Sequence, residues 1–251
     1  KLREAEWLVS EAAVKTGDFS SYPEKELQEA WKIALRNQFL DIIPGSSIHE
    51  VYEDSAAEYA KANEILDTIE KNALKVLVRE SDSIVTVVNN SSFAGEGIVT
   101  AKVKAYEGRK GSWFSADGKE LPAVYTEDGW FVKVSGIEPA GFTTLTYKIG
   151  TKAECFCTEE WTGEMDTPFY HIVWDKKGRM TSIFDKENDR EILKAGELGN
   201  HLVVYEDRPM KYDAWDIDIY YQEKGYEVDD LKTVSVEKSS LMTKVKMDWN
   251  Y

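Results

Sequence analysis

The sequence has little cysteine, no excess of basic residues and no long apolar run. Two cysteines among 251 residues exclude a disulfide framework. Lysine and arginine number 31 against 46 acidic residues, which gives a formal charge of −15. Because an acidic surface repels phosphate groups, we expect neither nucleic acid nor a membrane as partner. No apolar run reaches the roughly 18–20 residues of a membrane span, and no signal-peptide pattern opens the chain, so we expect a cytoplasmic protein.

The common signatures of catalysis are missing as well. The sequence contains no phosphate loop, G-x-S-x-G, H-E-x-x-H or dinucleotide fingerprint. Cys155 and Cys157 form a C-x-C pair, whereas a zinc site normally needs C-x-x-C and two further ligands. His49 and Glu53, four residues apart, could share a metal, but a surface hydrogen bond or ion pair is the simpler interpretation. The residues alone therefore do not assemble a complete active site.

The first 80 residues carry helical patterns. A stripe of apolar residues runs to about Lys15, and a second begins after Pro23, which suits a first helical turn. A third helix is predicted from Ser47, where Ser47 and Glu50 have capping-box spacing. It continues for about 30 residues, or roughly 45 Å. A helix of this length needs others packed along it, so we predict a three-helix bundle.

After Ser81 the apolar period changes from 3.6 to 2. The alternating positions include Val85, Val87, Val99, Ala101, Val103 and Ala105. Asp-Gly turn signals separate such runs, which predicts antiparallel strands to about residue 150. A polar stretch, 150–163, then leads to a second β region, in which residues 175–178 are predicted to form a turn between two strands.

We therefore predict a multi-domain protein with helices first and strands after. The expected domains are a three-helix bundle over 1–80, a small β-sandwich over 81–150 and the start of a larger, truncated β-sandwich over 151–251. Because both ends of the sequence fall inside patterned elements, we expect it to be a segment of a longer protein.

The first candidate functional residue is Asp41. It lies between the second and third predicted helices, next to a Pro44-Gly45 turn. A carboxylate at a rigid corner between helices can point outside the bundle. Acids at turns also often accept hydrogen bonds from backbone N–H groups, so a structural role stays open.

The second candidate is the segment 211–221, where three acids lie among four aromatic residues. Sugars are bound in this way, with C–H faces on aromatic rings and hydroxyls on carboxylates. If the segment were a strand, Asp213 and Trp215 would share one face and Asp216 would lie on the other. An amphipathic edge strand with solvated acids is the alternative.

The segment 37–54 resembles a signature of the bacterial α-mannosidases of glycoside hydrolase family 38. In that signature an Asn-Gln-Phe-His-Asp stretch precedes a Pro-Gly-Ser-Ser turn. Segments 184–186, 204–209 and 212–218 are also similar to family sequences. The resemblance covers nearly the whole chain and is weakest over 82–165.

This resemblance implies a long enzyme with an N-terminal β/α barrel, a three-helix bundle and then β-sandwich domains. Family members are retaining glycosidases: a carboxylate attacks the anomeric carbon and an acid protonates the leaving oxygen. A divalent metal, usually zinc, binds hydroxyls of the mannose. The nucleophile and most metal ligands belong to the barrel. This chain would be the middle bundle and the first part of the C-terminal β region, inactive alone, with α-mannosides as substrates of the full enzyme.

The resemblance also assigns site residues. Asp41 would lie close to the bound sugar, and Asp213, Trp215 and Asp216 would be neighbours of the cleft from the β-sandwich side. One position departs from the family: its histidine metal ligand is replaced here by Leu40, which has no lone pair to offer a metal. We therefore expect no metal bound to this segment.

Two alternatives to an enzyme segment stay open. The chain could be a non-catalytic carbohydrate-binding module that uses Trp215 and its acids. It could also be a scaffold, or a homo-oligomer in which the predicted helix 48–79 packs against another subunit.

Overall fold

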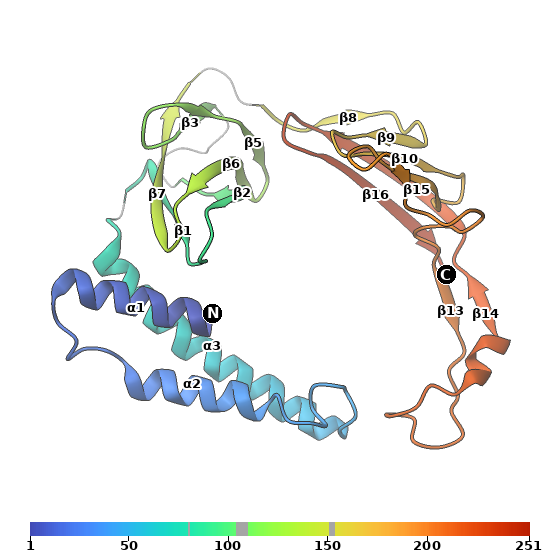
Figure 1. Cartoon of the computed structure of the whole chain (residues 1–251), viewed down its shortest axis with the longest axis horizontal. Coiled ribbons are helices and arrows are strands. Elements are labelled where there is room, and N and C mark those ends of the chain that lie inside the picture. The colour runs from blue at the N-terminus through green and yellow to red at the C-terminus, as the bar shows by residue number, and fades with distance from the viewer. Residues whose placement is uncertain (80, 104–109, 151–153) are drawn as a thin grey trace. The chain divides into compact units, whose positions relative to one another are not determined.

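The structure is a computed structural model that describes residues 1–79, 81–103, 110–150 and 154–251. It divides into two compact units, Lys1–Ala153 and Glu154–Tyr251 (Figure 1). The first unit contains the helices and a set of strands, and the second contains strands and one short 3-10 helix. The predicted order, helices followed by antiparallel sheets, is confirmed. The division into three domains at residues 80 and 150 stays a prediction.

Three helices open the chain: α1 (Leu2–Thr16), α2 (Glu24–Arg36) and α3 (His49–Leu77). Figure 1 shows α1 and α2 lying along the much longer α3. The residues that face one another are apolar and often small, which lets the helices approach closely. Those that form the main buried cluster are Ala5, Leu27, Ala30, Ile33, Ala62, Leu66 and Ile69. The predicted three-helix bundle is therefore present.

The predicted capping box at the start of α3 is wrong. The helix begins at His49 with Ile48 as its N-cap, and no side chain caps it. The hydroxyl of Ser47 instead donates to the carbonyl oxygen of Asp41 at 3.0 Å. Because the Ser47 hydroxyl donates its hydrogen bond to Asp41 and not to the helix end, Ser47 stabilises the preceding turn.

The strands of the first unit form two antiparallel sheets, ordered β1-β7-β3-β4 and β2-β6-β5. Their bounds are β1 (Ile84–Asn89), β2 (Gly95–Ala101), β3 (Gly111–Phe114), β4 (Glu120–Leu121), β5 (Ala123–Thr126), β6 (Gly129–Ile137) and β7 (Gly141–Ile149). Ala105, included in the predicted alternation, lies outside the described residues.

One aromatic core joins these two sheets. Trp113 and Tyr147 come from one sheet and Trp130 from the other, and all three side chains are buried. The ring of Tyr147 lies 5.4 Å from that of Trp113 and 5.8 Å from that of Trp130. Aromatic pairs at this spacing contribute beyond the area they bury. The two sheets therefore form a small β-sandwich. The bundle contacts it through Trp7, which stacks on Phe142 at 5.2 Å.

The second unit contains three small antiparallel sheets, ordered β12-β11-β10-β9, β16-β15-β8 and β13-β14. Their strands are β8 (Cys157–Glu159), β9 (Glu164–Asp166), β10 (Tyr170–Trp174), β11 (Met180–Asp185), β12 (Arg190–Glu191), β13 (Val203–Tyr205), β14 (Gly225–Glu227), β15 (Asp230–Lys238) and β16 (Thr243–Asn250). The 3-10 helix η1 (Ile219–Glu223) precedes β14.

Two features position the larger sheets of this unit. The turn predicted at 175–178 joins β10 to β11, with the Asp175 carboxylate accepting the N–H groups of Lys177 and Arg179. The indole N–H of Trp249, in the other sheet, donates to the carbonyl of Lys177 at 2.9 Å. Trp174 and Val236 are the buried apolar residues of this unit among those that the structure describes.

No helix among the described residues is long and apolar enough to cross a membrane.

Truncating Trp130 should destabilise the first unit. We expect Trp130→Ala to lower the free energy of unfolding by about 3–5 kcal/mol, because it leaves a cavity between two sheets. Ile149→Ala, at an exposed position of β7, is the control and should change it by less than about 0.5 kcal/mol. Urea unfolding followed by near-ultraviolet circular dichroism measures both. Equal effects of the two variants would contradict the shared core.

Candidate functional site

The candidate site in the first unit is the α2–α3 corner, residues 37–48. A series of turns forms it after α2 ends at Arg36. The N–H of Phe39 donates to the carbonyl of Arg36 at 3.1 Å, and that of Ile42 to the carbonyl of Phe39 at 3.0 Å. Gly45 has φ of 83°, a left-handed conformation that glycine adopts without a steric penalty. The Pro44-Gly45 turn predicted from the sequence is therefore part of the corner.

Asn37 fixes the corner to α3. Its side chain is 4% exposed, and its amide donates to the carbonyl of Ile33 at 2.9 Å and to Glu58 Oε2 at 2.7 Å. Arg36 forms an ion pair with the same carboxylate. The hydrogen bond from Asn37, followed by that from Arg36, holds the pKa of the Glu58 carboxyl below its ordinary value. Glu58 thus connects the end of α2 to the middle of α3.

The backbone of Asp41 is held on its carbonyl side. Its carbonyl oxygen accepts hydrogen bonds from the N–H of Ser46 at 3.2 Å, the hydroxyl of Ser47 at 3.0 Å and the hydroxyl of Tyr52 at 3.3 Å. Tyr52 also accepts the N–H of Ser47 at 2.9 Å. The Asp41 carboxylate is half-buried and has no hydrogen bond or ion pair to any described residue. The corner therefore fixes the main chain of Asp41 and leaves its charged group available.

Leu40 lies beside Asp41 and is 76% exposed. Phe39, Ile43 and Ile48 are exposed next to it, so the outer surface of the corner is apolar. Contiguous apolar surface of this kind marks sites of interaction. An isobutyl group offers no lone pair, and Asp41 is the one carboxylate of residues 37–48. The side chain at position 40 therefore cannot act as a metal ligand in the way that a histidine would.

No described group of three or more His, Cys, Asp or Glu side chains is placed to hold a metal ion. His49 and Glu53 face each other at 3.3 Å on the exposed side of α3, as the ion-pair interpretation expects. His171 and His201, which have no partners at useful spacing in the sequence, lie 3.2 Å from Asp166 and 3.4 Å from Glu227. Pairing of β9 with β10 brings Asp166 to His171, and pairing of β13 with β14 brings Glu227 near His201, so residue spacing alone gives neither partner.

The aromatic and acidic segment lies in the second unit and is not a strand. Tyr212 has φ of 57°, and its carbonyl accepts the N–H groups of Trp215 at 2.7 Å and Asp216 at 2.9 Å. The face assignment based on a strand is therefore wrong, because this turn gathers Asp213, Trp215 and Asp216 on one short bend. Trp215 is 66% exposed. The two carboxylates are exposed and have no hydrogen bond or ion pair within the described part of the chain.

Two family models match the chain. The α-mannosidase middle domain matches residues 1–77, and the C-terminal domain of glycosyl hydrolases family 38 matches residues 165–251. The chain belongs to the α-mannosidases of glycoside hydrolase family 38. The bundle with the α2–α3 corner is thus the family's middle domain, and the turn with Trp215 lies in its C-terminal domain.

Relatives support this assignment over most of the chain. The human α-mannosidase 2C1 is 25% identical over 226 residues, which is 88% of this chain and 20% of the human protein. The α-mannosidase of Saccharomyces cerevisiae is 24% identical over 225 residues, covering 88% of this chain and 17% of the yeast protein. The chain therefore spans about a fifth of the length of these relatives. A crystal structure of an α-mannosidase from Enterococcus faecalis V583 has the same fold over 75% of this chain and 27% of that one, with a TM-score of 0.57 and 20% identity.

Replacing Glu58 with glutamine should make the bundle less sensitive to acid. A carboxyl group whose pKa is lowered on folding stabilises the fold above its unfolded pKa, and this contribution is lost as the pH falls through the folded pKa. We expect the urea midpoint, followed by circular dichroism of the helices, to fall as the pH drops below 4.5, the ordinary value for this group. The Glu58→Gln midpoint should fall less over the same interval.

The control for this measurement is Glu29→Gln, which removes an exposed ion pair with Lys61 on the same two helices. It should change the midpoint at pH 7 little, because exposed pairs contribute little. Parallel acid profiles for Glu58→Gln and the unchanged chain would show that Glu58 does not tie α2 to α3.

Proposed function

We propose that this chain is the middle and C-terminal part of a retaining α-mannosidase that hydrolyses α-linked mannosides. Its nucleophile and most of its metal ligands would lie on an N-terminal barrel outside this chain, so the segment alone would be inactive. The chain's share of its relatives' length, about a fifth, is consistent with this division. A glycosidase needs two carboxyl groups across the scissile bond, and the α2–α3 corner offers a single one, that of Asp41.

The observation that carries the proposal is that Asp41 has a fixed main chain and a carboxylate unpaired within the described part of the chain. Its main chain is fixed by Ser46, Ser47 and Tyr52, while its carboxylate has no partner among the described residues. A polar group held in this way is preorganised to accept hydrogen bonds from sugar hydroxyls. We propose that Asp41 is a substrate-binding residue, and that the exposed apolar side chains around it pack against the barrel.

The C-terminal turn supports a second contact with the sugar. The exposed indole of Trp215 and the carboxylates of Asp213 and Asp216 offer an apolar face and hydrogen-bond acceptors on one bend. The same observation favours the second candidate function, a carbohydrate-binding module. In that case the isolated chain would bind mannosides through Trp215 without any contribution from a barrel.

Changing Asp41 to asparagine should impair the full-length enzyme without unfolding it. A hydrogen bond to a charged group is worth about 1.5–3 kcal/mol, so kcat/KM on an aryl α-mannoside should fall about 10- to 100-fold. Asp54→Asn, at an exposed position of α3, is the matched control and should keep the activity of the unchanged enzyme. The unfolding midpoint of Asp41→Asn should also be unchanged. An unchanged kcat/KM for Asp41→Asn would refute the role of Asp41.

Introducing histidine at position 40 should restore a ligand that the family uses. We expect Leu40→His to tighten zinc binding by the full-length protein at least about tenfold, since imidazole is a zinc ligand and leucine is not. Leu35→His, which places histidine at an exposed apolar position on the neighbouring helix α2, should leave zinc affinity unchanged. Isothermal titration with zinc measures both. Equal affinities for the two variants would show that position 40 does not face the metal.

A further inference from the structure

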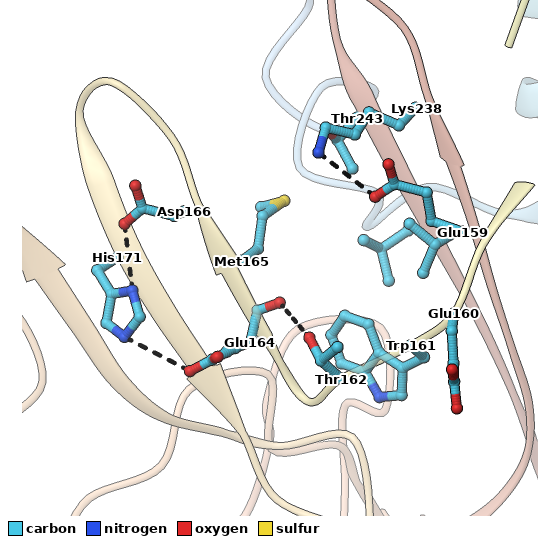
Figure 2. Close-up of a pocket in the computed structure, with 12 residues that line it drawn as sticks. Glu159, Glu160, Trp161, Thr162, Glu164, Met165, Asp166, His171, Lys238 and Thr243 are labelled. Atoms are coloured by element: carbon cyan, nitrogen blue, oxygen red, sulfur yellow. Dashed lines mark hydrogen bonds and ion pairs between the residues drawn. The ribbon is translucent and has the colours of Figure 1, made fainter. Parts of the chain in front are cut away.

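The second unit contains an open groove between two of its sheets. Figure 2 shows the groove, which has a volume of about 360 Å³. This volume is at the lower end of the roughly 300–1,000 Å³ that is usual for small-molecule sites. One wall comes from β9 and β10, and the other from β15 and β16. Its lining includes none of Asp41, Asp213, Trp215 and Asp216.

Apolar side chains from both walls line the groove. Val236 and Val245 are paired across β15 and β16, so their side chains share one face. Met165, on β9, lines the opposite wall (Figure 2). Val236 is buried, and the other two are half-buried. These three residues provide an apolar surface.

An indole ring lies at one end of the groove on a fixed support. The segment 160–163 crosses from β8, in one sheet, to β9, in the other. It bends at Gly163, where φ is 83° and the carbonyl accepts the N–H of Trp174 at 2.8 Å. Trp161, in this crossing, packs edge-on against the buried ring of Trp174 at 5.1 Å. The indole of Trp161 is therefore held in place, half-buried.

Polar groups of both hydrogen-bonding types surround this surface. Glu159 Oε2 lies 3.4 Å from Lys238 Nζ, so an acceptor and donors sit side by side. The hydroxyl of Thr243, next to Lys238 across the strand pair, makes no hydrogen bond to another described residue. On the opposite wall, His171 Nδ1 is 3.2 Å from Asp166 Oδ1 (Figure 2).

Four carboxylates line the groove: Glu159 and Asp166 each have a lysine partner, Lys238 and Lys186, while Glu160 and Glu164 are exposed to solvent. A small organic cation at Glu159 or Asp166 would have to compete with these lysines. A neutral ligand with several hydroxyl groups would instead add hydrogen bonds to pairs that are already in place.

We propose that this groove is a carbohydrate-binding site that takes a neutral pyranose ring. The apolar C–H face of the sugar lies against Trp161 and the side chains of Met165 and Val236. Its hydroxyls donate to Glu159 and accept from Lys238 and Thr243. A pyranose combines an apolar face with a polar edge, which is the combination that this groove offers.

The test is a titration of the 251-residue chain with methyl α-mannoside and α-1,6-mannobiose, followed by saturation-transfer difference NMR. We expect saturable binding in the millimolar range. Trp161→Ala should weaken it at least about tenfold. Thr243→Val should weaken it several-fold. This variant keeps the shape of the side chain, so it tests the groove even if Trp161→Ala does not fold. Phe169→Ala, at an exposed aromatic position of the second unit outside the lining of the groove, is the matched control and should leave it unchanged.

The remaining outcomes overturn the proposal. These are the absence of saturable binding, binding that Trp161→Ala and Thr243→Val leave intact, or a chain that binds spermine but neither sugar. Loss of binding in Trp215→Ala alone would assign the sugar to the 213–216 turn and also overturn it. None of these results depends on the role proposed for Asp41, which is measured by hydrolysis in the full-length enzyme.

Discussion

The carbonyl oxygen of Asp41 accepts hydrogen bonds from Ser46, Ser47 and Tyr52, and the α2–α3 corner depends on this interaction. These contacts fix the main chain of Asp41, while its carboxylate makes no hydrogen bond or ion pair to any described residue. Asn37 and Glu58 add a second tie between the same helices. The bundle thus provides a rigid base for one charged side chain that has no partner of its own among the described residues.

The corner and the C-terminal turn share one chemical design. Each places carboxylates that have no partner in the described part of the chain beside exposed apolar side chains, Leu40 in one and Trp215 in the other. A sugar or a second protein surface satisfies both kinds of group together, whereas water satisfies only the carboxylates. Leu40 is more apolar than the histidine of the family signature that this segment resembles, and its side chain has no lone pair for a metal ion. The substrate contact that we propose for Asp41 does not require a metal ligand at position 40.

Local patterns in the sequence predict the helices, the Pro44-Gly45 corner and the turn at 175–178, because each depends on residues close together in the chain. The apolar stripe of α3 and its small residue Ala62 face a buried cluster as expected. The capping box fails because the Ser47 hydroxyl has a better-placed acceptor in Asp41. The strand interpretation of the 213–216 region fails because Tyr212 adopts a left-handed conformation. Partners such as Asp166 for His171 and Glu227 for His201 arise from the strand pairs β9–β10 and β13–β14, which residue spacing alone does not encode.

The most direct test of this account is a crystal structure of the full-length protein with a mannose-derived glycosidase inhibitor bound. The account predicts an Asp41 carboxylate oxygen within hydrogen-bonding distance, about 2.5–3.2 Å, of a hydroxyl of the bound inhibitor, with the Asp41 carbonyl still held by Ser47 and Tyr52. An Asp41 carboxylate paired with a protein side chain and away from the inhibitor would contradict it.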